Sequence, residues 1–547
     1  MGCGSSKGAA AVEQPPASQT KDATLAEEGS AAAATKPVGS VEVYGVTGSM
    51  NCMSAVMLAD ASGCGKLVPC MPHQDTLKPE FLAMNPFHAV PLLKDGDFCL
   101  AETNAILHYM AEKYAPAAYP VADAKRCAFI DWALDRFSGV MYADAAKTIY
   151  PVLGYVSAPE DQAAAGKTCT ENLQEFAKVF LKEKFIGGDK PSIADYRVAP
   201  FFFCYAHPQL KEVSCVEVPN RIKQFNKDFA EACSASGLMS VAGGYALKEM
   251  LDAKAGSPAD MLTVSGIQET VNAALDFVME IADAFKDKVT AGSGKVEIHG
   301  APGSMNCMGP ILIAKHAGCG DMVQCIPGVD TQKPEFLAMN PFHAVPLLKD
   351  GDFCLAESSA ILRYLAVMYS QDLYPADAKV RGKINWAMDR FSSAMYDDAV
   401  KTLYPCFGYA APPEDRSAAG KACTEHLKEF ADVFLKDKFV AGDKLSIADF
   451  KVAPFFFAYE HDMVKEQSFV EVPERIRQFN KDFAQACSAA GMLSQAGGFA
   501  IKEILDKGVG PAIITNTEEQ APADPQSGVD ENPAGSVQQP CGCGLLF

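Results

Sequence analysis

The sequence lacks several features that mark common classes of protein. It has no run of roughly 18 apolar residues, which excludes a helix that crosses a bilayer, and no secretory h-region follows Met1. Basic residues are outnumbered, with 48 Lys and Arg against 68 Asp and Glu, so the formal charge is −20. Phosphate backbones repel such a surface, and we therefore expect no nucleic-acid partner.

Cysteine is abundant, but the spacing of known cysteine sites is missing. The chain has 19 cysteines and no C-x-x-C, and its nine histidines form no ligand-spaced cluster with them. We therefore expect no structural zinc and no other metal. Spread over a large acidic chain without a signal peptide, these cysteines are expected to be reduced thiols.

What the sequence does contain is a duplication. The segment KPEFLAMNPFHAVPLLKDGDFCLAE begins at Lys78 and recurs letter for letter at Lys333, an offset of 255 residues. Farther on, QFNKDFA at Gln224 recurs at Gln478, so the offset has fallen to 254. The chain therefore carries two copies of one unit, and the second copy has lost one residue.

Each copy changes character midway. Its first part alternates short strand-like runs, such as VEVYG, KLVPC, VPLL and FCL, with helical runs, including one expected from about Met50. The rest follows the 3.6-residue apolar period of helices. These patterns predict an α/β domain followed by an all-α domain, twice over.

The expected boundaries follow from these patterns. They are a disordered tail at 1–40, an α/β domain at 41–116, a helical domain at 117–251, a linker at 252–294, a second α/β domain at 295–371, a second helical domain at 372–505 and a disordered tail at 506–547. Apolar residues at three- and four-residue spacing in the linker indicate an amphipathic helix, either docked on a unit or serving as a solvated spacer.

Several motifs, in the same order in both copies, resemble the cytosolic glutathione transferases, closest to the delta and theta classes. NPFHAVPLL at Asn85 and Asn340 resembles the start of the family's third strand, and DGDFCLAET and DGDFCLAES resemble its glutathione-binding turn. GGDKPSIADY at Gly187 and AGDKLSIADF at Ala441 resemble its helical capping motif. Within them, Ser192 with Asp195 and Ser446 with Asp449 have the S-x-x-D spacing of a capping box, which predicts a structural role. The resemblance implies two tandem units, each an N-terminal thioredoxin-like domain followed by a C-terminal helical bundle domain.

The resemblance also implies which residues bind glutathione. They are His88, Val90, Pro91, Glu102 and Thr103 in the first copy, and His343, Val345, Pro346, Glu357 and Ser358 in the second. The Val-Pro bond is expected to be cis and to turn the valine backbone toward the cysteinyl part of glutathione, although an ordinary trans bond fits the sequence as well. The Glu with Thr or Ser opens a helix whose positive end suits the γ-glutamyl group. The histidine is expected at the glycyl end.

The chemistry of glutathione requires a thiolate, and a free thiol has a pKa of about 8.5. By resemblance to the serine classes, the hydroxyl that stabilises the thiolate belongs to Ser49 and Ser304, each at the start of the first helix. Tyr44 is a rival in the first copy, but its counterpart is His299. A mechanism shared by both copies therefore favours serine.

Cys52 and Cys307 are the more serious rivals. They lie three residues into the helix, where the dipole lowers the pKa of a thiol, and would suit a thiol transferase or a dehydroascorbate-type reductase. The catalytic cysteine of such classes aligns with Ser49, however. A cysteine at the later position is more often packed inward as a small hydrophobic residue.

Other positions depart from the family pattern. Met-Asn-Cys-Met follows the serine where Pro and Arg are usual, Thr76 and Thr331 stand where a histidine binds the glycyl carboxylate, and Asn104 and Ser359 replace an arginine. These departures weaken three polar contacts that the resemblance would imply for glutathione.

Four aromatic residues are candidates for a hydrophobic co-substrate pocket, or are simply part of the core: Phe87, Tyr142, Tyr396 and Phe407.

The first residues, MGCGSS, fit a myristoylation signal at Gly2. One myristoyl chain binds membranes only marginally, so Cys3 is expected to supply a second acyl chain. This predicts a cytoplasmic protein that is peripheral on the cytoplasmic face of a membrane. Near the other end, Cys541 and Cys543 are not placed for prenylation.

Taken with the resemblance, these observations predict a glutathione transferase that uses glutathione as co-substrate, without a metal, against small hydrophobic electrophiles or hydroperoxides. A membrane-tethered binding or scaffold protein with little activity and a cysteine-dependent thiol transferase are the alternatives. Enzymes of this family form two-fold dimers, so we expect either a pseudo-dimer within the chain or a homodimer.

Overall fold

The computed structural model describes residues 41–46, 48–153, 156–207, 210, 213–233, 295–301, 303–407, 410–491 and 493. We call residues 41–233 unit 1 and residues 295–493 unit 2. The two expected tails, the expected linker helix, the acylation candidates Gly2 and Cys3, and the cysteines at 541 and 543 lie outside the described residues.

Each unit begins with a four-stranded mixed sheet. Unit 1 contains β1 (Val41–Gly45), β2 (Gly65–Pro69), β3 (Leu92–Asp95) and β4 (Phe98–Ala101), in the order β2-β1-β3-β4. Unit 2 contains β5 (Val296–Gly300), β6 (Gly320–Gln324), β7 (Leu347–Asp350) and β8 (Phe353–Ala356), in the order β6-β5-β7-β8. The first two strands of each unit are parallel and the other pairs antiparallel. Because side chains alternate along a strand, Val41 and Val43 are buried while Glu42 and Tyr44 face the other side.

Helices make up the rest of each unit. In unit 1 they are α1 (Met50–Ala61), η1 (Asp75–Leu77), α2 (Pro79–Met84), α3 (Thr103–Tyr114), η2 (Pro116–Ala118), α4 (Ala124–Arg136), η3 (Phe137–Met141), α5 (Tyr142–Thr148), α6 (Gln162–Phe180), α7 (Ile193–Tyr205) and α9 (Asn220–Ala232). In unit 2 they are α11 (Met305–His316), η6 (Asp330–Gln332), α12 (Pro334–Met339), α13 (Ser358–Tyr369), η7 (Gln371–Leu373), α14 (Ala378–Arg390), η8 (Phe391–Met395), α15 (Tyr396–Thr402), η9 (Tyr404–Phe407), α16 (Arg416–Phe434), α17 (Ile447–Tyr459), α18 (Asp462–Ser468) and α19 (Glu474–Ala486). The predicted succession of a thioredoxin-like domain and a helical domain, twice over, is confirmed.

The predicted capping boxes are present at the buried helices α7 and α17. Ser192 donates to Asp195 Oδ2 from both its backbone N–H and its hydroxyl, each at 2.7 Å, and Ser446 and Asp449 repeat the arrangement. Burial raises the pKa of both aspartates to about 6, although these hydrogen bonds oppose the shift. The motif is therefore structural, as expected from its spacing.

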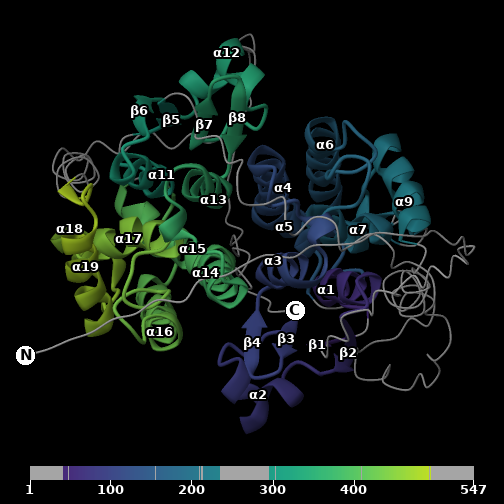
Figure 1. The fold of residues 1–547 in the computed structure, drawn as a ribbon, viewed down its shortest axis with the longest axis horizontal. Helices are drawn as coiled ribbons and strands as arrows, with labels where there is room; N and C mark the ends of the chain where they lie inside the picture. Colours follow the sequence, from purple (N-terminus) through teal and green to yellow (C-terminus); the bar gives the residue numbers. More distant parts are fainter. Residues whose placement is uncertain are drawn as a thin grey trace, which may run out of the picture.

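The two units face each other through copies of the same helices. Helix α3 packs against α14, and α4 packs against α13, the copy of α3. In Figure 1 these four helices occupy the centre, and the two sheets lie at opposite ends. The contact thus has the pattern of an isologous, two-fold interface within a single chain.

An aromatic ring from each unit is inserted into the other. The ring of Phe87, 4% exposed, lies 6.1 Å from Trp386 and 5.8 Å from Phe434, and the guanidinium of Arg390 lies 4.1 Å from it. Of the two roles left open for Phe87, a place in the core is supported and a co-substrate pocket is not, because the loop carries this ring outward into unit 2.

The second aromatic contact repeats the first in the opposite direction. Phe342 lies 6.0 Å from Trp132, 5.8 Å from Phe180 and 4.0 Å from the guanidinium of Arg136.

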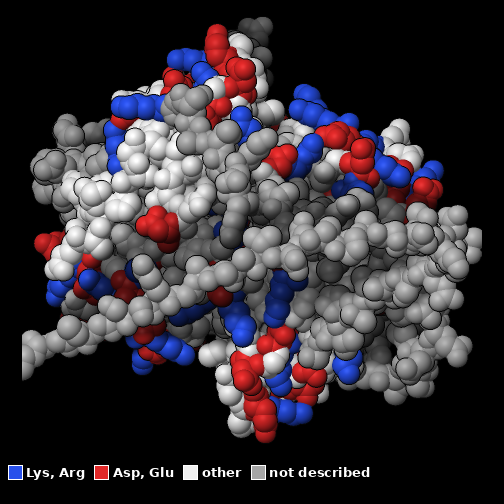
Figure 2. Space-filling model, viewed as in Figure 1, with Lys and Arg blue, Asp and Glu red and all other residues white. Residues whose placement is uncertain are grey.

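Among the described residues no helix is both long and apolar enough to span a bilayer. Figure 2 shows acidic and basic side chains interspersed over both units on the visible face.

Candidate functional site

Three loops meet at one edge of each sheet because of the strand register. Tyr44, near the end of β1, pairs with Leu92 at the start of β3, and Leu92 pairs with Ala101 at the end of β4. The segment that leads to Ser49, the Val90-Pro91 bond and the start of α3 therefore lie together. In unit 2, His299, Leu347 and Ala356 have the same register.

Ser49 and Ser304 are the N-cap residues of α1 and α11. Their backbone angles agree within a degree, with φ −67° and ψ 119° for Ser49 and φ −67° and ψ 118° for Ser304, and both are half-buried. The Ser49 Oγ accepts a hydrogen bond from the Cys52 N–H at 3.5 Å. A hydroxyl that accepts in this way still has its own proton to donate, next to the positive end of a helix dipole.

The rival Tyr44 is engaged elsewhere. Its hydroxyl donates to Glu42 Oε2 at 3.0 Å, and burial together with that carboxylate raises the pKa of Tyr44. In unit 2, His299 faces Glu297 in the same way, at 3.3 Å. Both residues interact with their own strand, which leaves serine as the shared candidate.

Cys52 and Cys307 are fully buried on the inner side of their helices. Burial raises the pKa of both thiols, to about 11 for Cys307, although the neighbouring serines oppose the shift. Each sulfur packs against a glycine of the first strand, where an added Cβ would lie within about 3 Å of it at Gly45 and Gly300. The cysteines therefore pack as small hydrophobic residues.

This burial predicts a clear order of thiol reactivity. At neutral pH a thiol with a pKa of about 11 is thiolate in roughly one molecule in ten thousand, and only the thiolate is nucleophilic. Iodoacetamide should alkylate the exposed Cys215 in the folded protein and leave Cys52 and Cys307 unmodified until the chain is unfolded, as read by peptide mass spectrometry. Labelling of either buried cysteine in the folded chain, or a glutathione adduct on it, would instead favour the thiol-transferase alternative.

Both predicted cis bonds are present, between Val90 and Pro91 and between Val345 and Pro346. His88 and His343 precede them on the exposed part of the loop, with φ values of 58° and 56°. The loop is fixed by Asn85, whose Nδ2 donates to the Ala89 carbonyl at 2.9 Å and whose Oδ1 accepts from the Phe87 N–H at 3.2 Å.

Glu102 and Glu357 precede α3 and α13 in a left-handed conformation, with φ of 67° and 69°. This conformation is strained for a residue with a side chain, and it occurs in both units at the predicted γ-glutamyl position. The Ser393 hydroxyl of unit 2 donates to Glu102 Oε1 at 3.3 Å. Burial raises the pKa of Glu102, while Arg390 and Ser393 oppose the shift, so unit 2 contributes directly to this part of unit 1.

A buried cation, which sequence reasoning missed, lies beside the start of each of these helices. Arg197 on α7 donates from Nε to Asn104 Oδ1 at 3.1 Å, and Lys451 on α17 donates to Ser358 Oγ at 2.6 Å. Burial lowers the pKa of Arg197 to about 10 and also lowers the pKa of Lys451. The positive charge absent from the helix start is thus supplied from the helical domain.

The two threonines at the positions expected near the glycyl end of glutathione contact the backbone of their own turn. Thr76 and Thr331 are buried, and their Oγ1 atoms accept from the His73 and Gly328 N–H groups at 2.9 Å. Their hydroxyls therefore stabilise a turn.

A pair of tyrosines adjoins the first turn of α1 and α11. Asn51 donates to the Tyr142 hydroxyl at 3.2 Å, and Tyr150 donates to the same oxygen at 3.2 Å. In unit 2 the corresponding contacts join Asn306, Tyr396 and Tyr404, at 2.9 to 3.3 Å. Tyr142 and Tyr396, the candidates for a co-substrate pocket or the core, are half-buried. The asparagine and the second tyrosine recur in both copies, which is the signal that could have identified them. Phe407 is buried.

Comparison with known proteins finds similarity over parts of the chain. Residues 39–112 and 322–367 match the family model described as glutathione S-transferase, N-terminal domain. Among solved structures, the chain is similar to a delta-class glutathione transferase from Nilaparvata lugens, with 26% identity, 39% of this chain and 100% of that chain covered, and a TM-score of 0.33. A glutathione transferase from Bombyx mori is 21% identical, with 40% of this chain and 98% of that chain covered and a TM-score of 0.35. A theta-class enzyme from Xanthomonas axonopodis, solved with glutathione bound, is 23% identical, with 36% of this chain and 98% of that chain covered and a TM-score of 0.31.

Proposed function

Because this chain carries two glutathione S-transferase-type units in tandem, we propose that it is a glutathione transferase that activates glutathione as a thiolate at Ser49 and Ser304. The observation that carries the proposal is the coincidence, at one sheet edge of each unit, of an N-cap serine, a cis Val-Pro bond and a left-handed glutamate. Its substrates would be small electrophiles or hydroperoxides.

Each group has a role in this proposal. The valine backbone before the cis proline pairs with the cysteinyl part of glutathione, and Glu102 accepts from the α-amino group of the γ-glutamyl part. The serine hydroxyl donates to the sulfur, and the N-terminus of α1 adds its positive potential. Arg197, or Lys451 in unit 2, supplies positive charge beside the γ-glutamyl carboxylate. His88 and His343 remain candidates for the glycyl end.

The two units are proposed to work as a pseudo-dimer within the chain. The reciprocal aromatic insertions of Phe87 and Phe342 and the hydrogen bond from Ser393 to Glu102 support this. Under this proposal each site needs both units, as in a two-fold dimer of separate chains.

A binding or scaffold role with little turnover is the second candidate. It is favoured by Thr76 and Thr331, whose hydroxyls are committed to the backbone. Calorimetric titration with glutathione, combined with conjugation of a chromogenic electrophile, separates the two. Binding with turnover is the result expected here, binding without turnover would favour the scaffold role, and absence of binding would contradict both.

We also propose that acylation at Gly2 and Cys3 tethers the protein to a membrane, since two acyl chains are needed for stable attachment. Support comes from the sequence motif. Metabolic labelling with an alkyne analogue of myristate should mark the parent and not Gly2→Ala, and an unlabelled parent would contradict the proposal.

A further inference from the structure

The helices at the contact between the units carry the same residues at some positions and different charges at others. Asp135 and Asp389 are equivalent, as are Tyr119 and Tyr374. Several positions differ, and four of them change the charge at the contact: His108, Glu112, Cys127 and Asp131 of unit 1 correspond to Arg363, Val367, Arg381 and Asn385 of unit 2. Unit 1 thus contributes additional carboxylates to the contact, and unit 2 contributes two additional guanidinium groups.

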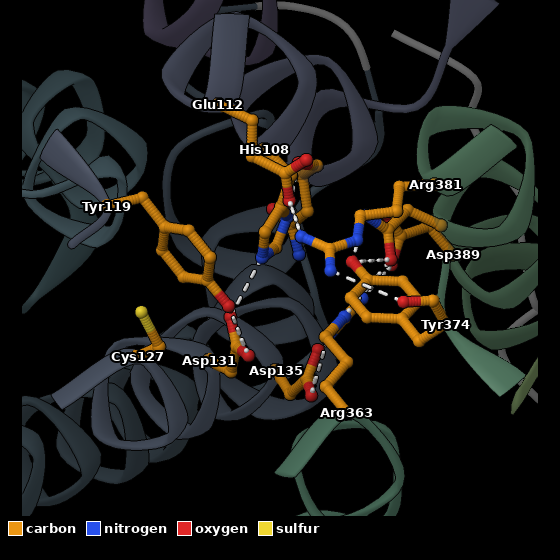
Figure 3. A network of polar contacts seen from close by, with 12 residues as sticks. His108, Glu112, Tyr119, Cys127, Asp131, Asp135, Arg363, Tyr374, Arg381 and Asp389 are labelled. Carbon is orange, nitrogen blue, oxygen red and sulfur yellow. Dashed lines mark hydrogen bonds and ion pairs between the residues drawn. The ribbon is translucent and has the colours of Figure 1, made fainter. Parts of the chain in front are cut away.

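Two of these residues, Arg363 and Arg381 of unit 2, contact carboxylates of unit 1, as Figure 3 shows. Arg381 donates to Glu112 Oε1 at 3.4 Å, with 18% and 8% of the two side chains exposed. Burial raises the pKa of Glu112, an effect that Arg381 opposes. The pair therefore places a buried anion of unit 1 against a cation of unit 2, and neither charge has a counterpart in the other copy.

Arg363 forms a second link. Its side chain is 2% exposed, and it lies 3.5 Å from Asp135 of unit 1 and 3.6 Å from Asp389 of its own unit. Its Nε donates to Asn385 Oδ1 at 3.1 Å. The guanidinium thus lies between the two equivalent aspartates, and burial alone would raise the pKa of both carboxyls.

The residues equivalent to this second link behave differently in unit 1. His108 contacts Asp131 Oδ1 at 2.8 Å and the Asn104 carbonyl at 2.8 Å, both within its own unit. The Tyr119 hydroxyl donates to the other oxygen of Asp131 at 2.9 Å. Both ring nitrogens of His108 therefore have hydrogen-bond partners within unit 1. At this position only Arg363 of unit 2 forms an ion pair with the other unit.

The aromatic part of the contact does not distinguish between the units. Phe87 and Phe342, with the tryptophan, phenylalanine and arginine around each, are copies of one another. Two copies of unit 1, or two of unit 2, would make these contacts equally well. Discrimination has to come from positions that differ, and among the described residues both ion pairs between the units involve one or more of the four named above.

We infer that these four positions make the contact specific for unlike units, so that unit 1 pairs with unit 2 and like units are rejected. In a pair of unit 1 faces, Glu112 would meet Cys127 and lose its cation, twice over. In a pair of unit 2 faces, Arg381 would meet Val367 and lose its anion, twice over. A buried charge that loses its partner is strongly destabilising, and rejection of a wrong partner by such a charge is a general means of specificity.

Exchange of the four positions in the full chain tests this inference. One variant carries His108→Arg, Glu112→Val, Cys127→Arg and Asp131→Asn. A second carries Arg363→His, Val367→Glu, Arg381→Cys and Asn385→Asp. In each of these variants the two units present like faces to each other. The Tm of each variant should therefore lie about 10 °C below that of the parent.

The third variant carries all eight substitutions and restores unlike faces with their positions reversed. Its Tm should return to within about 5 °C of the parent, since the charges are again paired. An eightfold variant no more stable than either fourfold variant would overturn the inference, as would a fourfold variant with the Tm of the parent.

A double-mutant cycle on the Glu112–Arg381 pair tests the inference with fewer substitutions, in case a fourfold variant fails to fold. Glu112→Val and Arg381→Cys each leave one charge without its partner, whereas the double variant removes both. The double variant should have a higher Tm than Arg381→Cys alone. A double variant that loses the sum of the two single losses would show that the pair does not interact and would contradict the inference.

Discussion

A chain that carries both Ser49→Ala and Ser304→Ala is expected to conjugate glutathione about 10- to 150-fold more slowly than the parent at neutral pH. A hydrogen bond to a charged group is worth about 1.5–3 kcal/mol, and here it would stabilise the thiolate and not the thiol. Removing the hydroxyl raises the pKa of the bound thiol, so the loss should shrink as the pH is raised. The measurement is the pH profile of kcat/KM.

The single variants and a matched control sharpen this prediction. Each single variant should retain the turnover of the unaltered unit. Ser62 caps the opposite end of α1, where its hydroxyl donates to the Leu58 carbonyl at 2.7 Å, and its counterpart in unit 2 is Ala317. Ser62→Ala is therefore a serine-to-alanine change in the same helix that unit 2 already contains, and it should leave kcat/KM unchanged. A double variant as fast as this control would refute the serine mechanism.

Phe87→Ala and Phe342→Ala are expected to cost about 3–5 kcal/mol each, the usual range for a buried phenylalanine truncated to alanine. Each ring is inserted into the other unit, and each variant also loses a contact with a guanidinium group, that of Arg390 for Phe87 and that of Arg136 for Phe342. The measurement is the Tm together with the affinity for glutathione, which should also fall because the same loop carries the cis Val-Pro bond.

Two comparisons make the aromatic prediction specific. Because the two aromatic contacts are copies, the two variants should lose similar stability. Phe469 is 51% exposed, so Phe469→Ala, the same chemical change, should cost less than about 0.5 kcal/mol. A Phe87→Ala chain with the Tm of this control would contradict the account of the interface.

Features encoded over a few neighbouring residues could be predicted from the sequence. The capping box at Ser192 and Asp195, the cis bond before Pro91 and the helix start at Thr103 each follow from local spacing and from resemblance. Their geometry depends on backbone conformation within one turn or one loop, and the structure has each of them.

Features that depend on distant segments could not be predicted in the same way. Phe87 could be assigned to a pocket or to the core, because nothing local says that its loop points into unit 2. Arg197 lies 93 positions along the chain from the Asn104 that it contacts. Comparison of the two copies would have singled out Arg363 and Arg381, because these charges have no equivalent in unit 1.

The central claim is that a serine hydroxyl in each unit keeps the sulfur of bound glutathione ionised. It is tested most directly by titration of that thiol, read by the ultraviolet difference absorbance of the thiolate in the glutathione complex. In the parent the bound thiol should have a pKa about one to two units below that of free glutathione, and in the Ser49→Ala, Ser304→Ala chain the pKa should return toward the free value. A bound thiol that titrates like free glutathione in the parent, or identically in both chains, would contradict the account.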